Sequence, residues 1–229
     1  MKVNANNISM KFMRQGETSN YFYGVVPQSL ELKEGTLTAV CGRSGSGKTT
    51  LLNILAGLQP PTEGQVYHGD TDLYAMSDEA LSVWRGTKLG VIPQGRAMLD
   101  TLTVMENILL PTMLHPQKQT EQAYRERAEA LLQQLEIESL AGSYPPALSG
   151  GELRRAAIVR ALLHSPELIF ADEPTGDLDD ISTRKVLALL REEADRGATV
   201  LMVTHDQEAL QYADLCWRMD AGKIDVLRV

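Results

Sequence analysis

The sequence has few of the features that mark secreted, membrane-spanning or nucleic-acid-binding proteins. Its two cysteines, Cys41 and Cys216, lie in no C-x-x-C or metal-ligand pattern, so we expect free thiols in a reducing cytosol. No apolar run approaches the roughly 18 residues of a membrane span, and the first residues lack the apolar stretch of a signal peptide. With 22 basic and 30 acidic residues, the formal net charge is −8, which argues against a nucleic-acid partner.

What the sequence does contain is enough apolar material for a core, together with one glycine-rich motif. The chain has 229 residues, of which 43% are hydrophobic, so it has room for one large domain or two small ones. The segment Gly42-Arg43-Ser44-Gly45-Ser46-Gly47-Lys48-Thr49-Thr50 fits G-x-x-x-x-G-K-[ST] at every position. An apolar strand-like run, 37–41, precedes it and a helical run, 51–56, follows it. This is the context that a phosphate-binding P-loop requires.

The P-loop predicts how a nucleotide is held. Its glycines allow successive backbone N–H groups to point inward, and the helix that starts near Lys48 presents its positive N-terminal end to an anion. We expect Lys48 to reach the β- and γ-phosphates and the Thr49 hydroxyl to coordinate Mg²⁺. The motif therefore predicts a site for a nucleoside triphosphate and its magnesium ion.

Two later strands also end in polar residues. The apolar run 168–171 leads into Asp172 and Glu173, and the run 199–203 leads to His205. Because ligands of open α/β sheets bind at the carboxyl ends of parallel strands, we expect these residues to converge on the P-loop. Asp172 suits magnesium coordination, and Glu173 is placed to orient or deprotonate the attacking water.

A second anion-binding motif and a hinge complete the pattern. Ser149, Gly150 and Gly151 offer a hydroxyl and two unobstructed backbone N–H groups at a predicted helix N-terminus. Residues from about 96 to 157 are predicted to form a helical insertion, with a capping box at 103–106 and a long helix at 120–135. Gln94 lies between a proline and a glycine at the entrance to this insertion, which is a natural hinge.

The remaining segments carry local predictions. Residues 3–12 and 29–32 alternate as strands, and residues 13–26 between them are expected to form a loop. Its aromatic residues, and Phe12 before it, offer rings that a nucleotide base can stack on. Short strands are expected at 65–68 and 73–74, followed by a helix that Ser77 caps.

Together these motifs resemble the ATP-binding-cassette (ABC) family over essentially the whole chain. The matches are Walker A at 42–50, the hinge glutamine at 94, the signature at 148–152, Walker B and its glutamate at 168–173, the aspartate loop at 176–179 and the switch histidine at 205. The resemblance implies a P-loop NTPase fold with a RecA-like parallel-sheet core, an N-terminal antiparallel β subdomain and an inserted α-helical subdomain. It implies one ABC ATPase domain over 1–229, with the core and β subdomain at about 1–95 and 158–229 and the helical subdomain at about 96–157.

The resemblance also implies roles for individual residues. The catalytic set is Glu173, His205, Gln94 and Lys48, and the metal-binding set is Thr49, Gln94 and Asp172. The nucleotide-binding set is Phe12, Gly42, Arg43, Ser44, Gly45, Ser46, Gly47, Lys48, Thr49, Thr50, Gln94, Ser149, Gly150, Gly151 and Asp179. In the family, two cassettes pack head to tail, so that the signature of one covers the ATP held by the P-loop of the other.

Within the family, the segments 101–108 and 172–179 look like those of the lipoprotein-release, macrolide-efflux and antimicrobial-peptide-resistance ATPases. Three features depart from the common pattern. Glu152 replaces a glutamine and is followed by Leu153-Arg154-Arg155 in place of a glutamine-rich continuation, which leaves the ribose contacts open. Proline stands at 93, where an aromatic residue is common. The base-stacking position matches Phe12, often a tyrosine in the family, with Tyr23 as a competitor.

The sequence thus predicts the ATP-binding and ATP-hydrolysing subunit of a membrane ABC transporter. We expect it to dimerise around two Mg-ATP and to drive export or mechanical work by a permease, from the cytoplasmic face of the membrane. The permease is expected to dock on the segment from Gly95 to about Met113, which carries the apolar Met98, Leu99, Leu102 and Met105. The alternatives are a P-loop kinase, a nucleotide-gated clamp on DNA or ribosomes, and a structural module without turnover.

Overall fold

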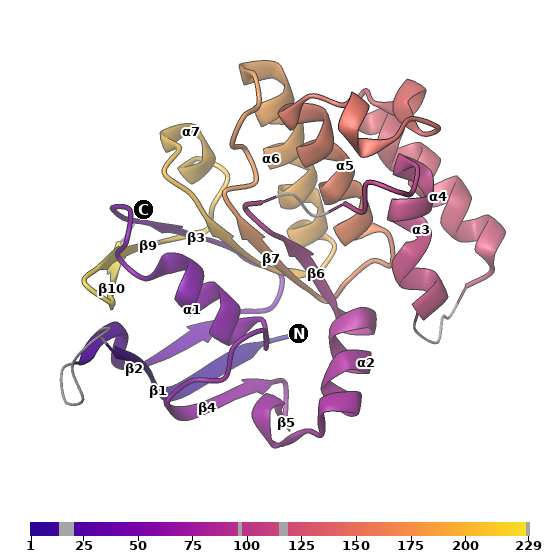
Figure 1. Cartoon of the computed structure of the whole chain (residues 1–229). Helices are drawn as coiled ribbons and strands as arrows, with labels where there is room; N and C mark the ends of the chain where they lie inside the picture. Colours follow the sequence, from indigo (N-terminus) through magenta and orange to yellow (C-terminus); the bar gives the residue numbers. More distant parts are fainter. Residues whose placement is uncertain (14–20, 96–97, 115–118, 228–229) are drawn as a thin grey trace.

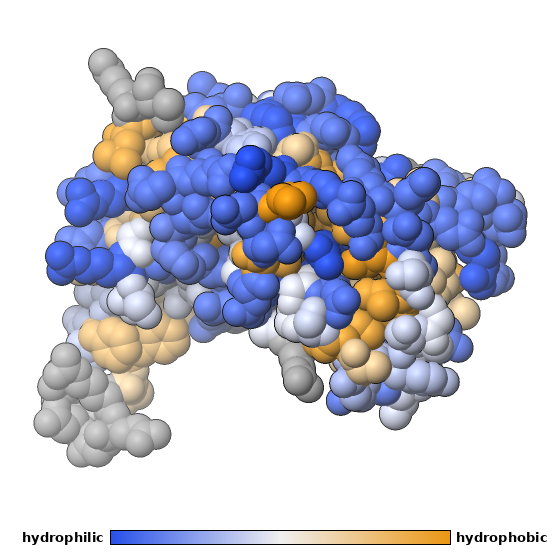
Figure 2. Space-filling model, turned by 90° about the horizontal axis from the view of Figure 1, so that it is seen from above, coloured by the Kyte–Doolittle hydropathy of each residue, from blue (hydrophilic) through white to orange (hydrophobic). Residues whose placement is uncertain are grey.

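Two β-sheets and a group of helices make up the fold (Figure 1). The computed structural model describes residues 1–13, 21–95, 98–114 and 119–227. One sheet has six strands in the order β10-β9-β3-β8-β7-β6, and the other has four strands in the order β2-β1-β4-β5. Seen from above, the surface is largely hydrophilic, with apolar residues at the centre and right of the view and in smaller areas on the left (Figure 2).

The elements have the following bounds. The strands are β1 (Val3–Met13), β2 (Tyr21–Leu32), β3 (Leu37–Cys41), β4 (Glu63–His68), β5 (Thr71–Asp72), β6 (Leu89–Ile92), β7 (Leu168–Asp172), β8 (Thr199–Val203), β9 (Leu215–Asp220) and β10 (Lys223–Leu227). The α-helices are α1 (Lys48–Leu55), α2 (Asp78–Lys88), α3 (Val104–Leu114), α4 (Glu121–Gln134), α5 (Gly150–Leu162), α6 (Asp180–Asp195) and α7 (Gln207–Leu210). Short 3-10 helices lie at η1 (Leu73–Ala75), η2 (Glu138–Leu140) and η3 (Pro145–Ala147).

The parallel part of the large sheet brings the predicted strand ends to one edge. Strands β3, β8, β7 and β6 run parallel, β9 is parallel to β3, and β10 is antiparallel to β9. In the register, Val203 lies opposite both Val40 and Asp172. The carboxyl ends of β3, β7 and β8 are therefore level with one another. The α/β class and the parallel core are confirmed, as is the antiparallel β sheet at the N-terminus.

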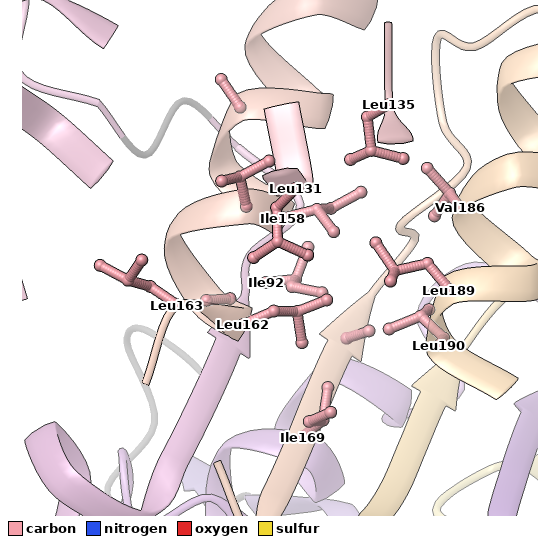
Figure 3. Close-up of a cluster of buried hydrophobic side chains, with 14 of the residues drawn as sticks. Ile92, Leu131, Leu135, Ile158, Leu162, Leu163, Ile169, Val186, Leu189 and Leu190 are labelled. Atoms are coloured by element: carbon pink, nitrogen blue, oxygen red, sulfur yellow. The ribbon is translucent and has the colours of Figure 1, made fainter. Parts of the chain in front are cut away.

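The two faces of the large sheet pack against different layers. In β7, Ile169 and Ala171 join the apolar cluster of the helices α3 to α6, whereas Leu168 and Phe170 join the cluster of α1 and the small sheet. This alternation follows from the two-residue period of a strand, and burial on both faces explains the continuous apolar run. Figure 3 shows Ile158 and Leu162 of α5 at the centre of the first cluster, which joins the helical segment to the sheet.

Two local predictions are wrong. Residues 21–26 do not form a loop but begin β2, which pairs with β1 so that Phe22 lies opposite Phe12. Aromatic residues gain cross-strand packing in a hairpin, and this outweighs the loop-like composition. Leu73 and Tyr74 form η1 in place of a strand, because Asp72 caps that turn by accepting the Tyr74 N–H at 3.2 Å. Residues 14–20 of the predicted loop lie outside the described part of the chain.

The predicted helix starts are confirmed. Ser77 caps α2, Thr120 caps α4, and Thr103 and Glu106 form reciprocal hydrogen bonds at the start of α3. The α3 helix, which the sequence predicts to end at about Leu110, continues through Pro111 to Leu114. No helix of the described residues is long and apolar enough to cross a bilayer. The division into subdomains at 96 and 157 stays a prediction.

Candidate active site

The loop between β3 and α1 closes tightly around its glycines. Gly47 has φ +105°, and a Cβ atom there would lie 2.0 Å from the Gly24 carbonyl oxygen, so only glycine fits. Lys48 Nζ donates to the carbonyl oxygens of Gly42, at 2.8 Å, and Arg43, at 3.0 Å. The ammonium group is thus held over the loop, close to where the backbone N–H groups and the start of α1 favour an anion.

A cavity of about 570 Å³ lies over this loop and collects most of the predicted site. Its volume is in the range of small-molecule and cofactor sites. The predicted residues that line it are Phe12, Gly42, Ser44, Gly45, Gly47, Lys48, Thr49, Thr50, Gln94, Asp172, Glu173 and His205. Arg43 and Ser46 lie on the loop but outside this lining. The three strand ends therefore do converge on one cavity.

Asp172 and Thr49 form a corner of this cavity that fits a hard cation. Asp172 is 4% exposed, its Oδ1 has no hydrogen-bond partner among the described residues, and its carboxylate accepts a hydrogen bond from the Thr49 hydroxyl. Burial raises the pKa of the Asp172 carboxyl, and the neighbouring Glu173 raises it further. A buried carboxylate with a free oxygen beside a hydroxyl, with Gln94 lining the same cavity, is an oxygen donor set that suits Mg²⁺.

Glu173 is held in an unusual backbone conformation beside His205. Its φ is +50°, which costs a residue with a Cβ roughly 1–2 kcal/mol. The Glu173 N–H donates to the Val203 carbonyl oxygen at 2.9 Å, which ties the end of β7 to the end of β8. His205 Nδ1 lies 2.8 Å from Glu173 Oε2. The carboxylate is thereby oriented from two sides at the mouth of the cavity.

One end of the cavity is lined by two aromatic rings. Phe12 and Phe22 line the cavity and stack with ring centroids 5.6 Å apart. Tyr23 lies on the other face of the hairpin, where the Lys11 ammonium sits 5.6 Å from its ring centre. Phe22 was only one of several candidate rings in the sequence. The wall beneath the rings is Gly24, where a Cβ atom would lie 2.5 Å from the Phe12 ring.

The signature residues lie in a different cavity. A second pocket of about 400 Å³ is lined by Ser149, Gly150, Gly151 and Asp179, together with Glu152 and Arg155. These four predicted nucleotide-binding residues are therefore not brought to the P-loop of the same chain. The Ser149 hydroxyl donates to Glu152 Oε2 at 2.8 Å, and hydrogen bonds from the Ser149 N–H and hydroxyl hold the pKa of Glu152 below its usual value.

Asp179 also has a local structural role. Its carboxylate accepts the Ser182 N–H at 2.8 Å and the Ser182 hydroxyl at 3.1 Å, which caps the start of α6 and lowers the pKa of Asp179. Arg155 donates to the same Ser182 hydroxyl. The aspartate loop and the signature helix are thus joined within one chain.

Comparison with known proteins places this arrangement in a family. The ABC transporter family model matches residues 26–176. The chain is 39% identical to the lipoprotein-releasing system ATP-binding protein LolD of Aquifex aeolicus, over 86% of the chain and 87% of that protein. It is 36% identical to the macrolide export ATP-binding/permease protein MacB of Rhodopirellula baltica, over 86% of the chain but 29% of that protein.

A solved structure shows the same fold. The ATP-binding cassette MJ0796, in a dimeric post-hydrolysis state bound to ADP and Pi, aligns with a TM-score of 0.90 at 33% identity and covers 99% of each chain. The family match and this fold agree with the P-loop cavity described above. The chain therefore belongs to the ABC transporter family, as one of its ATP-binding and ATP-hydrolysing subunits.

Proposed function

We propose that two copies of this chain close around two Mg-ATP and drive a membrane permease. The observation that carries this proposal is the separation of two anion sites within one chain. Lys48, Asp172 and Glu173 line the P-loop cavity, whereas Ser149 and Gly151 of the signature line another cavity. A second copy, packed head to tail, supplies the missing half of each site. The dimeric state of the MJ0796 cassette supports this arrangement.

The proposed metal site follows from the donor set. Asp172, Thr49 and Gln94 would hold Mg²⁺, because the buried Oδ1 of Asp172 is otherwise left without a partner among the described residues. A bound Mg²⁺ would neutralise charge on the β- and γ-phosphates. Asp172 would hold the metal as a carboxylate, so the raised pKa of its carboxyl would make magnesium affinity fall as the pH is lowered.

Within this site, the remaining residues divide the work of hydrolysis. Lys48 binds the β- and γ-phosphates as a point charge. Glu173 orients the attacking water and accepts its proton, and it is the carboxylate of the cavity that is left once Asp172 takes the metal. His205 holds Glu173 through the contact at its Nδ1 and adds a donor at the mouth of the cavity. Phe12 and Phe22 stack on the base.

The permease is proposed to dock near the hinge, which would keep the protein at the cytoplasmic face of the membrane. Leu99, Met113 and Leu114 are 52%, 72% and 67% exposed. Apolar side chains this exposed are typical of a protein contact surface. In Figure 2 apolar residues are visible on the side on which Figure 1 places α3, α4 and α5, as well as in other areas of the surface. The names of LolD and MacB, which refer to release and export systems, support a transport role.

Mixed subunits test the shared site. Lys48→Ala breaks the P-loop and Ser149→Ala breaks the signature, so each homodimer is expected to lose most ATP hydrolysis. In a mixture, the heterodimer contains one site with an intact Lys48 and an intact Ser149, and hydrolysis is expected to recover to at most about a quarter of wild type for random pairing. Light scattering should also show ATP-dependent dimers of Glu173→Gln. A mixture as inactive as its parents, or a mass indifferent to ATP, contradicts the shared site.

A further inference from the structure

Arg154, on the signature helix α5, reaches across to the backbone of the hinge. Its two terminal N–H groups donate to the carbonyl oxygens of Pro93, at 2.7 Å, and Gln94, at 2.5 Å. The three residues belong to separate parts of the fold, because Pro93 and Gln94 follow strand β6 whereas Arg154 lies some 60 positions later. One guanidinium therefore bridges the exit of the sheet and the helix that carries the signature.

The acceptors that this arginine meets lie at the edge of the large sheet. Arg154 is the fifth residue of α5, so it lies in the second turn of the helix, after the N-cap Ser149. Strand β6 is the last strand of its sheet, so the carbonyl groups that follow it have no further strand to pair with. The forked guanidinium supplies donors to two such carbonyls at once, which a lysine cannot match in geometry.

Gln94 is the point at which this contact meets the nucleotide cavity. Gln94 lines the P-loop cavity, and it also lines a neighbouring pocket of about 300 Å³ together with Arg154 and Asp177. Arg154 also approaches the segment after Glu173, since a Cβ atom on Gly176 would lie 3.8 Å from its Nη2. Arg154 thus lies between the backbone of the hinge and the segment after the proposed general base, outside the cavity itself.

We propose that Arg154 is a positioning residue for ATP hydrolysis. Its guanidinium fixes the backbone at Pro93 and Gln94, so that the Gln94 side-chain amide faces the proposed metal site. The same hydrogen bonds make this backbone move together with the signature helix α5. The inference rests on the proposed role of Gln94. It predicts that turnover and the rigidity of residues 89–95 are lost together when the guanidinium fork is removed. Substrate affinity should change little, because Arg154 does not line the P-loop cavity.

The test measures activity and local rigidity in the same variants. Arg154→Gln is expected to lower kcat about 10- to 100-fold with KM for Mg-ATP within a factor of about three, since small misplacement of a reacting group has effects of this size. Hydrogen exchange of the amides in 89–95 should become several-fold faster at an unchanged melting temperature. Arg154→Lys should recover less than half of the lost activity. Arg218→Gln, at an exposed arginine of β9, is the matched control and should behave as wild type.

The double variant separates this inference from the proposed function. Gln94→Ala alone should lose as much kcat as Arg154→Gln, and adding Arg154→Gln to it should cost no more, because both act through one group. Additive losses, unchanged exchange at 89–95, or full rescue by lysine overturn the positioning role. If Gln94→Ala hydrolyses ATP normally while Arg154→Gln still loosens 89–95, the proposed role of Gln94 is wrong, and the contribution of Arg154 to turnover is overturned with it.

Discussion

His205 Nδ1 lies 2.8 Å from Glu173 Oε2, and the backbone N–H of His205 points to the same oxygen at 3.4 Å. The glutamate side chain is only 12% exposed, whereas the histidine side chain is 77% exposed. The imidazole therefore covers the carboxylate from the solvent side. The backbone N–H of Glu173 is fixed by its hydrogen bond to the carbonyl oxygen of Val203, the last residue of β8. Because both residues follow adjacent parallel strands, any shift between β7 and β8 changes this contact directly.

The first prediction concerns the proposed general base. Glu173→Gln keeps the shape and the contact to His205 but removes the proton acceptor, so ATP hydrolysis should fall by about 100-fold or more. ATP affinity should stay close to wild type, because the phosphates are held by the P-loop. Phosphate release and equilibrium binding of a fluorescent ATP analogue measure the two effects. Lys48→Ala is the contrasting variant and should lose binding itself. Near-normal hydrolysis by Glu173→Gln would remove this carboxylate from the mechanism.

The second prediction concerns the base-binding rings. Phe12→Ala should weaken binding of ATP about tenfold or more, since stacking of one base on an aromatic ring contributes about 1–3 kcal/mol. Phe12→Tyr keeps a ring and should bind nearly as wild type. Tyr23→Ala is the matched control, because its ring faces Lys11 on the opposite side of the hairpin. Titration with the same fluorescent analogue decides between them, and a larger loss in Tyr23→Ala would assign the stacking role to that ring.

Features of the site that depend on local pattern were predictable from the sequence. Each of the two apolar runs that lead to Asp172 and His205 is a pattern of only a few consecutive residues. Parallel pairing of the two strands then places their carboxyl ends side by side at one edge of the sheet. The P-loop likewise carries its own geometry in its glycines. The engagement of the Ser149 hydroxyl by Glu152 was not predicted, although the spacing S-x-x-E that produces it is visible in the sequence.

Features that depend on register or on distant contacts were not predictable. The pairing of β1 with β2 shifts between Met10 and Lys11, and this shift places Phe22, and not Tyr23, opposite Phe12 at the cavity. No count of alternating residues reveals such a shift. The hydrogen bonds of Arg154 to the carbonyl groups of Pro93 and Gln94 join segments about 60 positions apart, so only the packing of α5 against β6 creates them.

The third prediction is a loss of stability in acid that His68 causes. His68 is 1% exposed, its Nδ1 accepts the Trp84 indole N–H at 3.2 Å, and its Nε2 lies 2.8 Å from the Leu55 carbonyl oxygen. This pairing requires a neutral ring with the proton on Nε2. Burial lowers the pKa of His68 from 6.5 to about 4. Protonation is therefore favoured in the unfolded chain, and the free energy of unfolding falls as the pH drops from 6.5 toward 4.

The size of this effect follows from the shift, and it amounts to about 3 kcal/mol over that interval. Urea unfolding at a series of pH values measures it. His68→Gln can keep both hydrogen bonds but does not titrate, so its stability should depend less steeply on pH below about 6.5. At about pH 8 the side chain at position 68 is neutral in both proteins. The difference between their free energies of unfolding at this pH therefore measures the effect of the substitution on packing alone. An equally steep pH dependence in the variant would show that other groups control the acid response.

The fourth prediction tests the docking surface for the permease. Leu99 is 52% exposed, while its backbone is fixed by the buried Asn107, whose side-chain amide accepts the Leu99 N–H at 2.7 Å and donates to the Leu99 carbonyl oxygen at 3.0 Å. The sequence also suggested Met98 and Met105. However, Met105 is only 9% exposed and Met98 packs against the core, so a charge there would disturb the fold. Leu99 and the 72% exposed Met113 are the cleaner positions.

Leu99→Asp and Met113→Asp should therefore abolish co-purification with the permease that the wild-type chain retains, because a buried interface rarely tolerates an unpaired charge. Both variants should keep the melting temperature and the ATP affinity of the wild type. Val83→Asp is the matched control, since Val83 is a 43% exposed apolar residue on α2, in another part of the molecule. If both variants still retain the permease at wild-type levels, the partner docks elsewhere. Equal loss in Val83→Asp would mean that any added surface charge disrupts the complex, and the assignment of the surface to the segment after Gly95 would then be withdrawn.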